Sequence, residues 1–341
     1  MDHGPRFRTL YLHIGLGKTG TTSIQRELAE KAARLEQRCD LHFPTALSHW
    51  KQFRGNHSDM LRAMFAQAPR PRRRLATLGL HNDEDIAAYN GVNQGDLLAG
   101  FAASNAKDLL FSAEVVAHFE PVDLAALADW CRGIATRVVV VACIRHPVHA
   151  LSSEIQQRLR IGARLENLYQ NPPRYRFREL FGHLGEAFGA DALRVYSYHD
   201  AVDHPHGLAS ALLAQGDMDA GDLLEPQPAA NVRMSSEAAL LLSAYNREFP
   251  AFILGRRNPD RTPRTVRTLA SIPGHRYQAP AEALERTQQL TAEDVGWLQS
   301  HFGLVLEYPP VEPGDVDPAF SGEALRAVAL AIAGRHGKPG S

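Results

Sequence analysis

The sequence has few cysteines, almost no net charge and no long apolar run. Cys39, Cys131 and Cys143 are its only cysteines, an odd number without CxxC spacing. This argues against both a disulfide framework and a cysteine-rich zinc site. The net charge is −1 at neutral pH, so no overall field draws the protein to nucleic acid or to acidic membranes. Any anion site must therefore be built locally.

The apolar runs exclude a membrane-spanning class of protein. The longest, from Val138 to Ile144, is far shorter than the roughly 20 residues that cross a bilayer. The N-terminal stretch MDHGPRFRTLYLHIG has no apolar segment of signal-peptide length. We therefore expect no integral membrane segment and a cytoplasmic location. The 341 residues, 44% of them hydrophobic and 22% charged, are typical of a globular protein with a substantial core.

Short apolar runs alternate with helical patterns over the first 200 residues. We predict strands near residues 9–15, 40–43, 107–112, 137–144 and 193–198, and helices near 22–38, 123–133, 147–160 and 235–247. Residues 137–144 (RVVVVACI) are apolar at nearly every position, which is typical of a central parallel strand covered on both faces. The alternation predicts an α/β fold in three layers: a central, mostly parallel sheet flanked by helices, with a helical C-terminal region.

A glycine-rich loop, GLGKTGTT, lies between the first predicted strand and its helix. Glycines allow successive backbone N–H groups to point inward, and the helix N-terminus adds partial positive charge. Lys18 supplies a full charge, and threonine hydroxyls are further donors. The loop therefore predicts an anion site of the phosphate type. Its candidate residues are Gly17, Lys18, Thr19, Gly20, Thr21 and Thr22.

The spacing of this loop does not fit a Walker-A NTPase. That pattern would need a glycine at position 12, where Leu12 lies inside the strand. The apolar strand 137–144 is followed by Arg145 instead of a metal-binding aspartate. Arginine at the end of a parallel strand lies at the binding edge of the sheet. Together with a hydroxyl of Ser152 or Ser153 on the next helix, Arg145 predicts a second anion site, and hence a ligand with phosphates at both ends.

These motifs resemble the sulfotransferases that use 3′-phosphoadenosine 5′-phosphosulfate (PAPS), in particular the bacterial branch that acts on carbohydrates and small molecules. KTGTT is similar to their 5′-phosphosulfate loop, with Gly17 in place of the usual proline. Arg145, followed by His146-Pro147 and by Ser153 eight residues later, is similar to their 3′-phosphate motif. In that motif the position of His146 is more often Asp or Asn. The family spacing selects Ser153 over Ser152.

The resemblance covers roughly residues 9–200 and is weaker to about residue 305. It implies a P-loop-like fold with one domain over residues 1–305, in which core strands occupy about 9–200 and a helical cap and lid about 201–305. Residues 306–341 would form a C-terminal tail with a short helix. It also implies PAPS as co-substrate, 3′,5′-ADP as product and no metal. The acceptor would be a hydroxyl or amine of a carbohydrate, glycolipid or other small molecule, with no nucleic-acid partner.

Sulfuryl transfer needs stabilisation of the leaving phosphate and a base for the proton of the acceptor. Lys18 is the candidate for the first task. Glu114, just beyond the predicted strand 107–112, is the first candidate for the base. His57, in GNHSDML, is the second, because the unperturbed pKa of histidine suits base chemistry near neutrality. The base is therefore open between Glu114 and His57.

Several alternatives stay open at the level of sequence. The chain could be a nucleotide-binding or regulatory protein that keeps the fold without transfer chemistry, or a small-molecule kinase with a degenerate phosphate loop. The arginine-rich segment from Arg256 to Arg267 could be a lid over the 3′-phosphate, a dock for an acidic acceptor, or a solvated loop. The sequence does not identify the acceptor, and it does not distinguish a monomer from a homo-oligomer.

Overall fold

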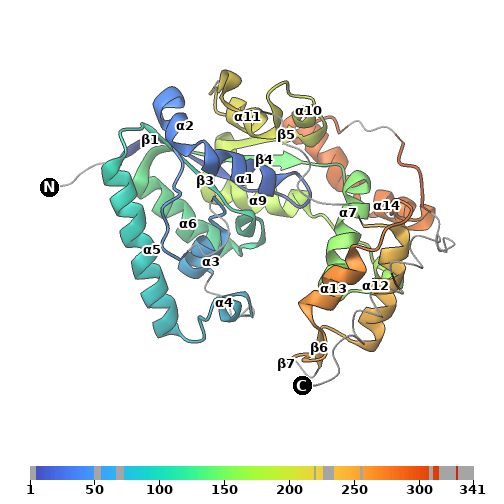
Figure 1. The fold of residues 1–341 in the computed structure, drawn as a ribbon. Helices are drawn as coiled ribbons and strands as arrows, with labels where there is room; N and C mark the ends of the chain where they lie inside the picture. Colours follow the sequence, from blue (N-terminus) through green and yellow to red (C-terminus); the bar gives the residue numbers. More distant parts are fainter. Residues whose placement is uncertain are drawn as a thin grey trace. The chain divides into compact units, whose positions relative to one another are not determined.

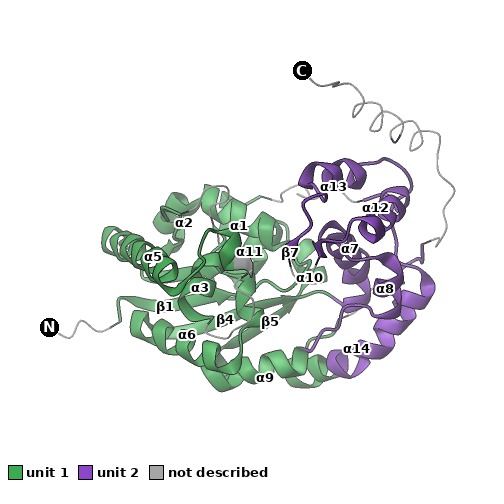
Figure 2. Ribbon diagram, turned by 90° about the horizontal axis from the view of Figure 1, so that it is seen from below, with its two compact units in different colours: residues 1–145, 177–230, 297–306 green, residues 146–176, 231–296, 307–341 purple. Residues whose placement is uncertain are grey.

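The structure is a computed structural model, and it describes residues 5–49, 55–66, 73–218, 220–225, 234–253, 256–306, 310–314 and 328. The chain divides into two compact units (Figure 2). The first unit contains residues 1–145, 177–230 and 297–306; the second contains residues 146–176, 231–296 and 307–341. Most of the predicted tail, 306–341, lies outside the described residues, and the single domain over 1–305 stays a prediction.

A five-stranded parallel sheet forms the centre of the first unit (Figure 1). The strands lie in the order β2-β3-β1-β4-β5. Their bounds are β1 Phe7–His13, β2 Leu41–His42, β3 Asp108–Ser112, β4 Ala135–Ile144 and β5 Leu193–Ser197. β1 lies in the middle, so that His13 pairs with Ser112 of β3 on one side and with Val141 of β4 on the other. All five strands match the predicted ones to within two residues at either end.

Helices cover both faces of this sheet (Figure 2). On one face, Tyr11 and Val141 pack in a buried cluster with Leu28 of α1 (Thr21–Glu30) and Leu212 of α11 (Gly207–Ala214). On the other face, α6 (Pro121–Ile134) and α9 (Phe177–Phe188) pack against the central strands. The layered α/β architecture predicted from the alternation of strands and helices is thereby confirmed.

The first unit contains further helices and short 3₁₀ turns. They are the helices α2 Ala32–Cys39, α3 Ser58–Phe65, α4 Arg73–Thr77, α5 Asp83–Ala103 and α10 Tyr198–Val202, and the 3₁₀ turns η1 Glu114–His118, η2 Ala190–Ala192 and η3 Gly221–Leu223.

The second unit is helical in its described residues, apart from one short hairpin. Its core gathers Leu151, Ile155 and Leu159 of one helix with Leu242 and Ala239 of another. The elements are α7 Pro147–Arg160, α8 Leu165–Gln170, α12 Ser236–Glu248, α13 Pro263–Ala270, α14 Ala281–Phe302, and the antiparallel strands β6 Phe252–Ile253 and β7 Arg256–Arg257. The last residues of α14 belong to the first unit. The predicted helix 147–160 is confirmed at both ends.

The predicted helix 22–38 is wrong in one respect, because the structure divides it at Lys31. The backbone there has φ −103° and ψ 7°, outside ordinary helical values. The N–H of Lys31 still donates to Glu27 O at 3.0 Å, and the N–H of Leu35 donates to Lys31 O at 2.9 Å. The hydrogen-bond ladder therefore continues through a local bend, which the apolar spacing does not record.

Candidate functional site

The strand order places three loops side by side at the carboxyl edge of the sheet. From β1 the chain moves to β2 and β3 on one side, and then crosses to β4 and β5 on the other. In open parallel sheets, ligands bind where the order reverses in this way. The loop after β1 therefore lies between the end of β3, which leads to Glu114, and the end of β4, which leads to Arg145.

The predicted phosphate loop, residues 15–22, spans the connection from β1 to α1 and the first two residues of α1. Gly20 is the N-cap of α1 with φ 78°, and no side chain caps this helix end. The positive φ favours glycine there; a Cβ at Gly20 would also lie 2.4 Å from Leu208 Cδ1, the end of a flexible side chain that would have to move. Lys18 has φ 67°, a left-handed conformation that costs a non-glycine residue roughly 1–2 kcal/mol. The fold thus tolerates local strain at the residue predicted to carry the charge.

The threonines of the loop divide into two kinds. Thr19 and Thr21 are buried, and Thr19 Oγ1 donates to Leu16 O at 2.7 Å. Thr21 Oγ1 fills the space beside Gly15, where a Cβ would approach it to 2.2 Å. Thr22 is exposed. Thr19 and Thr21 therefore shape the loop with their side chains, whereas Thr22 presents its side chain to solvent.

Arg145 is tied to this loop. It is the first residue after β4, and its Nη1 donates to Lys18 O at 3.2 Å. Its guanidinium carbon lies 5.0 Å from the ring centroid of Tyr198, the first residue of α10 after β5. A cation held over an aromatic face gains electrostatic stabilisation. A hydrogen bond therefore joins the side chain of Arg145 to the backbone of Lys18, the other predicted anion-binding cation. Tyr198, which the sequence predicted only as the end of a strand, packs against Arg145.

The two candidate serines on α7 of the second unit have different surroundings. Ser152 Oγ accepts the N–H of Ala279 at 2.9 Å and donates to Gln278 Oε1 at 3.3 Å. Ser153 is half-buried, and its hydroxyl has no hydrogen bond to any described residue. Ser152 is thus engaged within its own unit, while the hydroxyl of Ser153 remains available. Because Arg145 belongs to the first unit and Ser153 to the second, their joint role stays a prediction.

His146 occupies a capping position in α7. Its Nδ1 accepts the N–H of Val148 at 3.3 Å, and Pro147 follows at the first helical position. Aspartate and asparagine are strong N-cap residues. The departure from the family pattern at position 146 therefore preserves the capping function.

Glu114 stands on the β3 side of the loop. It opens η1, two residues beyond the end of β3, and its side chain is exposed. The preceding residue, Ala113, donates its N–H to His13 O at 2.8 Å. This bond ties the backbone before Glu114 to the last residue of β1. The backbone that carries Glu114 is therefore fixed next to the start of the phosphate loop.

His57 lies in the interior. It is fully buried; its Nδ1 accepts the N–H of Ser112 at 3.1 Å, and its Nε2 lies 3.1 Å from Pro44 O, to which it can donate. Phe43 and Phe111 pack edge-on against the imidazole. Burial lowers the pKa of His57 to about 4. Both ring nitrogens are engaged with the backbone, which is the arrangement of a structural histidine.

A buried polar network that the sequence did not reveal joins the ends of β1 and β3. His13 Nδ1 lies 2.9 Å from Ser112 Oγ, which also accepts Gln25 Nε2 of α1 at 3.0 Å. His13, Ser112 and Gln25 are buried to 99% or more, and burial lowers the pKa of His13 to about 4. The only signal for this network in the sequence was the presence of His13 and Ser112 at the ends of apolar strands. It makes the base of the site rigid.

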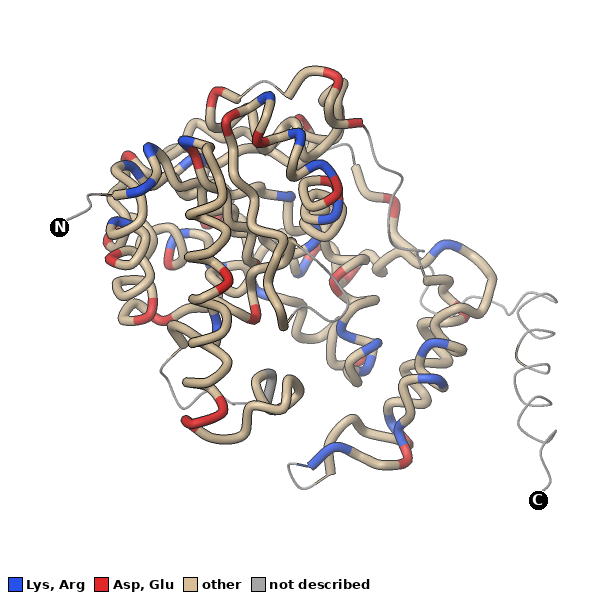
Figure 3. The backbone as a smooth tube through the Cα atoms, turned by 60° about the vertical axis from the view of Figure 1, so that its left-hand side comes forward, with Lys and Arg blue, Asp and Glu red and all other residues tan. Residues whose placement is uncertain are grey.

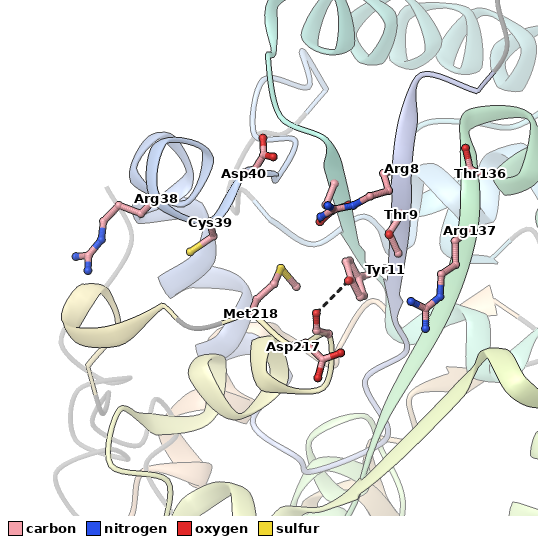
Figure 4. A pocket seen from close by; sticks show the side chains of 12 residues that line it. Arg8, Thr9, Tyr11, Arg38, Cys39, Asp40, Thr136, Arg137, Asp217 and Met218 are labelled. Atoms are coloured by element: carbon pink, nitrogen blue, oxygen red, sulfur yellow. Dashed lines mark hydrogen bonds and ion pairs between the residues drawn. The ribbon is translucent and has the colours of Figure 1, made fainter.

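A cavity of about 600 Å³ lies at the opposite, amino end of the same strands (Figure 4). Its lining includes the ion pair between Arg8 of β1 and Asp108 of β3, together with Arg137 of β4. Tyr11 donates its hydroxyl to Gly216 O at 3.1 Å within it. Since the phosphate loop, Glu114 and Arg145 all lie at the carboxyl edge, this cavity is separate from the candidate site.

The described part of the chain contains neither a cluster of side chains that could hold a metal ion nor a helix that could cross a membrane. No group of three or more His, Cys, Asp or Glu side chains there is arranged to hold a metal ion. No helix there is both long enough and apolar enough to cross a membrane.

Comparison with known proteins gives structural likenesses at low identity. No known protein family and no curated protein matches the sequence. Among solved structures, a sulfotransferase from Alicyclobacillus acidocaldarius is 13% identical, with a TM-score of 0.40 over 72% of this chain and 93% of that chain. The sulfotransferase domain from the curacin biosynthetic pathway is 14% identical, with a TM-score of 0.35 over 85% of this chain and 98% of that one. These values do not assign a family.

Proposed function

We propose that this protein is a PAPS-dependent sulfotransferase that modifies a hydroxyl or amine of a carbohydrate, glycolipid or other small acceptor. The observation that carries the proposal is the hydrogen bond from Arg145 Nη1 to Lys18 O. A magnesium nucleotide hydrolase would need a carboxylate after the strand that Arg145 follows. This chain has a cation there, and that cation is held against the backbone of the phosphate loop.

The distribution of charge suits a donor with two anionic ends. The loop amides, Lys18 and Thr22 would hold the 5′-phosphosulfate at the N-terminus of α1. Arg145, on the β4 side of the loop, would bind the 3′-phosphate, and Ser153 stays the predicted hydroxyl partner of that phosphate. Thr19, Thr21 and Gly20 shape the base of the loop.

In the proposed reaction the acceptor oxygen or nitrogen attacks the sulfur of PAPS from the side opposite the leaving phosphate. The new bond to sulfur forms as the bond between sulfur and the bridging oxygen breaks, and its electron pair remains on the 5′-phosphate of 3′,5′-ADP. Lys18 and the loop amides stabilise the charge that develops there. A base accepts the proton that the acceptor loses. The protein contributes mainly positioning and electrostatics.

Glu114 is the better candidate for that base. Its carboxylate is exposed at the β3 side of the loop, opposite the side of Arg145, where an acceptor can approach. His57, the other candidate, uses both ring nitrogens on backbone groups in the interior. A catalytic base must reach the proton that it removes, so the exposure of Glu114 supports its assignment.

The first test is the thermal stability of the protein with 3′,5′-ADP, compared with 5′-AMP and with ATP plus magnesium. A ligand that binds only the folded state adds about 2.7 kcal/mol of stability at 100 times its Kd. We expect a rise in Tm with 3′,5′-ADP alone, and its loss in Arg145→Ala. Arg132→Ala, at an exposed arginine of α6, is the matched control.

Two other results would overturn the proposal in different ways. A rise in Tm with ATP and magnesium but not with 3′,5′-ADP would favour a small-molecule kinase. A rise with 3′,5′-ADP without any sulfuryl transfer from PAPS to a panel of sugars and lipids would favour a regulatory nucleotide-binding protein. Transfer is measured with ³⁵S-labelled PAPS.

A further inference from the structure

The hairpin of β6 and β7 in the second unit exposes apolar and basic side chains together. Phe252 pairs with Arg257 and Ile253 with Arg256. Phe252 is 43% exposed and Ile253 is 48% exposed, while both arginines are fully on the surface. Phe249, shortly before the hairpin, is also exposed at 38%. Three large apolar side chains within five residues form a local surface feature, in contrast to single exposed apolar residues, which are common.

The hairpin is held firmly to the rest of its unit. Asn258 donates its N–H to Ala251 O at 3.1 Å, which closes the two strands. Arg261, four residues after β7, donates to Asn246 Oδ1 at 2.9 Å and to Arg160 O at 3.1 Å. Ala251 packs so closely on the turn after α7 that a Cβ at Gly162 would lie 2.6 Å from it. The apolar residues are therefore presented by an anchored element.

The charge around the hairpin is strongly positive, although the whole chain carries −1. Residues 247–267 contain six arginines and only two carboxylates. Two of the arginines are engaged locally, Arg247 with Glu166 and Arg261 with backbone and amide oxygens. The other four are exposed and form no ion pair with a described carboxylate: Arg256, Arg257, Arg264 and Arg267.

Helix α13, which begins six residues after β7 in the chain, carries two further exposed arginines. Arg264 and Arg267 are three residues apart and hence share one face of the helix, while Val266 is buried on the other. Figure 3 marks the basic positions of the chain in blue. We use the name hairpin surface for the hairpin side chains Phe252, Ile253, Arg256 and Arg257. Phe252 and Arg257 share one face of the hairpin, and Ile253 and Arg256 share the other.

We propose that the hairpin surface binds the anionic face of a lipid bilayer. Its arginines would contact lipid phosphates, and Phe252 and Ile253 would enter the boundary between headgroups and acyl chains. This combination of exposed apolar side chains and unpaired cations is what peripheral membrane binding requires. An acidic polymer would use the arginines but gain little from the apolar pair, which is why we favour a lipid surface. The inference is independent of the proposed sulfuryl transfer.

The test is co-sedimentation of the full chain with vesicles of phosphatidylcholine, with or without about 30% phosphatidylglycerol. We expect binding to the anionic vesicles only. Arg256→Gln with Arg257→Gln should weaken the partition coefficient about 25-fold, because each arginine near an anionic surface contributes about fivefold. Phe252→Ser with Ile253→Ser should weaken it about tenfold or more, since binding also scales with buried apolar area.

Matched controls lie outside the hairpin surface. Leu98→Ser replaces an apolar residue that is 67% exposed on α5, and Arg34→Gln with Arg286→Gln removes two exposed arginines. These controls should leave the partition coefficient unchanged. All seven substituted positions, four in the hairpin and three in the controls, are exposed, and circular dichroism would confirm folding.

Two results would overturn the proposal. One is equal sedimentation with neutral and anionic vesicles, or none with either. The other is a loss on substitution of the arginines with no effect of the Phe252 and Ile253 substitutions. If dextran sulfate also competed with the vesicles for binding, that second pattern would indicate that the hairpin surface binds an acidic polymer.

Discussion

At the scale of single residues, the proposed chemistry depends on three side chains that follow three adjacent strands. Lys18 follows β1, Glu114 follows β3 and Arg145 follows β4. Arg145 is held by Lys18 O and by the ring of Tyr198. Glu114 is exposed, as a base that meets an external acceptor must be. In the proposed mechanism, donor binding would lie on the Arg145 side of the loop and proton removal on the Glu114 side.

This division leads to a prediction for Glu114→Gln. Because the amide cannot accept the proton of the acceptor, we expect sulfuryl transfer to fall about 10²- to 10⁴-fold, while the rise in Tm with 3′,5′-ADP is retained. Glu30→Gln, at an exposed glutamate at the end of α1, should change neither. Full activity of Glu114→Gln would remove Glu114 from the mechanism. ³⁵S transfer and thermal unfolding are the two measurements.

At the scale of elements, the phosphate loop depends on the conformation in which α1 begins. Gly20 has φ 78°, and a Cβ there would approach Leu208 to 2.4 Å. We therefore expect Gly20→Ala to lower the free energy of unfolding by about 1–3 kcal/mol and to weaken binding of 3′,5′-ADP. Urea unfolding and titration calorimetry test the two effects.

The control for this prediction is a glycine inside a helix. Gly95 of α5 is exposed, and no atom lies within 4 Å of the Cβ that alanine would add. Gly95→Ala should raise the free energy of unfolding by about 0.5–1 kcal/mol, since glycine is the poorer helix former. If both substitutions changed the free energy of unfolding in the same direction, the special role of the Gly20 conformation would be refuted.

At the scale of the whole molecule, two buried histidines link stability to pH. Burial lowers the pKa of His13 and of His57 to about 4, whereas the unfolded chain binds these protons below about pH 6.5. Between these values the unfolded state holds more protons, so stability falls as the pH drops. We expect a loss of about 3 kcal/mol per histidine between pH 6.5 and pH 4, and almost no contribution to the slope above about pH 8.

The measurement is the free energy of unfolding in urea across this range of pH. His57→Asn removes one titrating group while keeping a side chain that can bond to the backbone, and it should remove about half of the slope even if it lowers stability at neutral pH. His81→Asn, at an exposed histidine, should leave the slope unchanged. A free energy that is flat from about pH 7 to pH 4 would contradict the buried, neutral state of both imidazoles.

The sequence by itself determined the elements with strong local patterns. Strand β4 could be predicted because it is apolar at nearly every position, and α7 because Pro147 begins it and its apolar residues recur with helical spacing. The loop residues 15–22 and Arg145 could be assigned to the same edge, because parallel strands share a carboxyl edge. In contrast, α5 was not predicted: of its 21 residues, only Asn93, Leu97 and Phe101 are buried, so that no apolar stripe marks it.

Only the tertiary structure decided which of the candidate residues are accessible and which are interior. The sequence offers Glu114 as the first and His57 as the second candidate for the base, and in the structure Glu114 is exposed whereas His57 is fully buried between Ser112 and Pro44. The bond between Arg145 and Lys18 joins residues 127 positions apart, and local spacing cannot encode such a contact. Burial and long-range hydrogen bonds depend on strand order and on the packing of helices over the sheet, and these arise only when the whole chain folds.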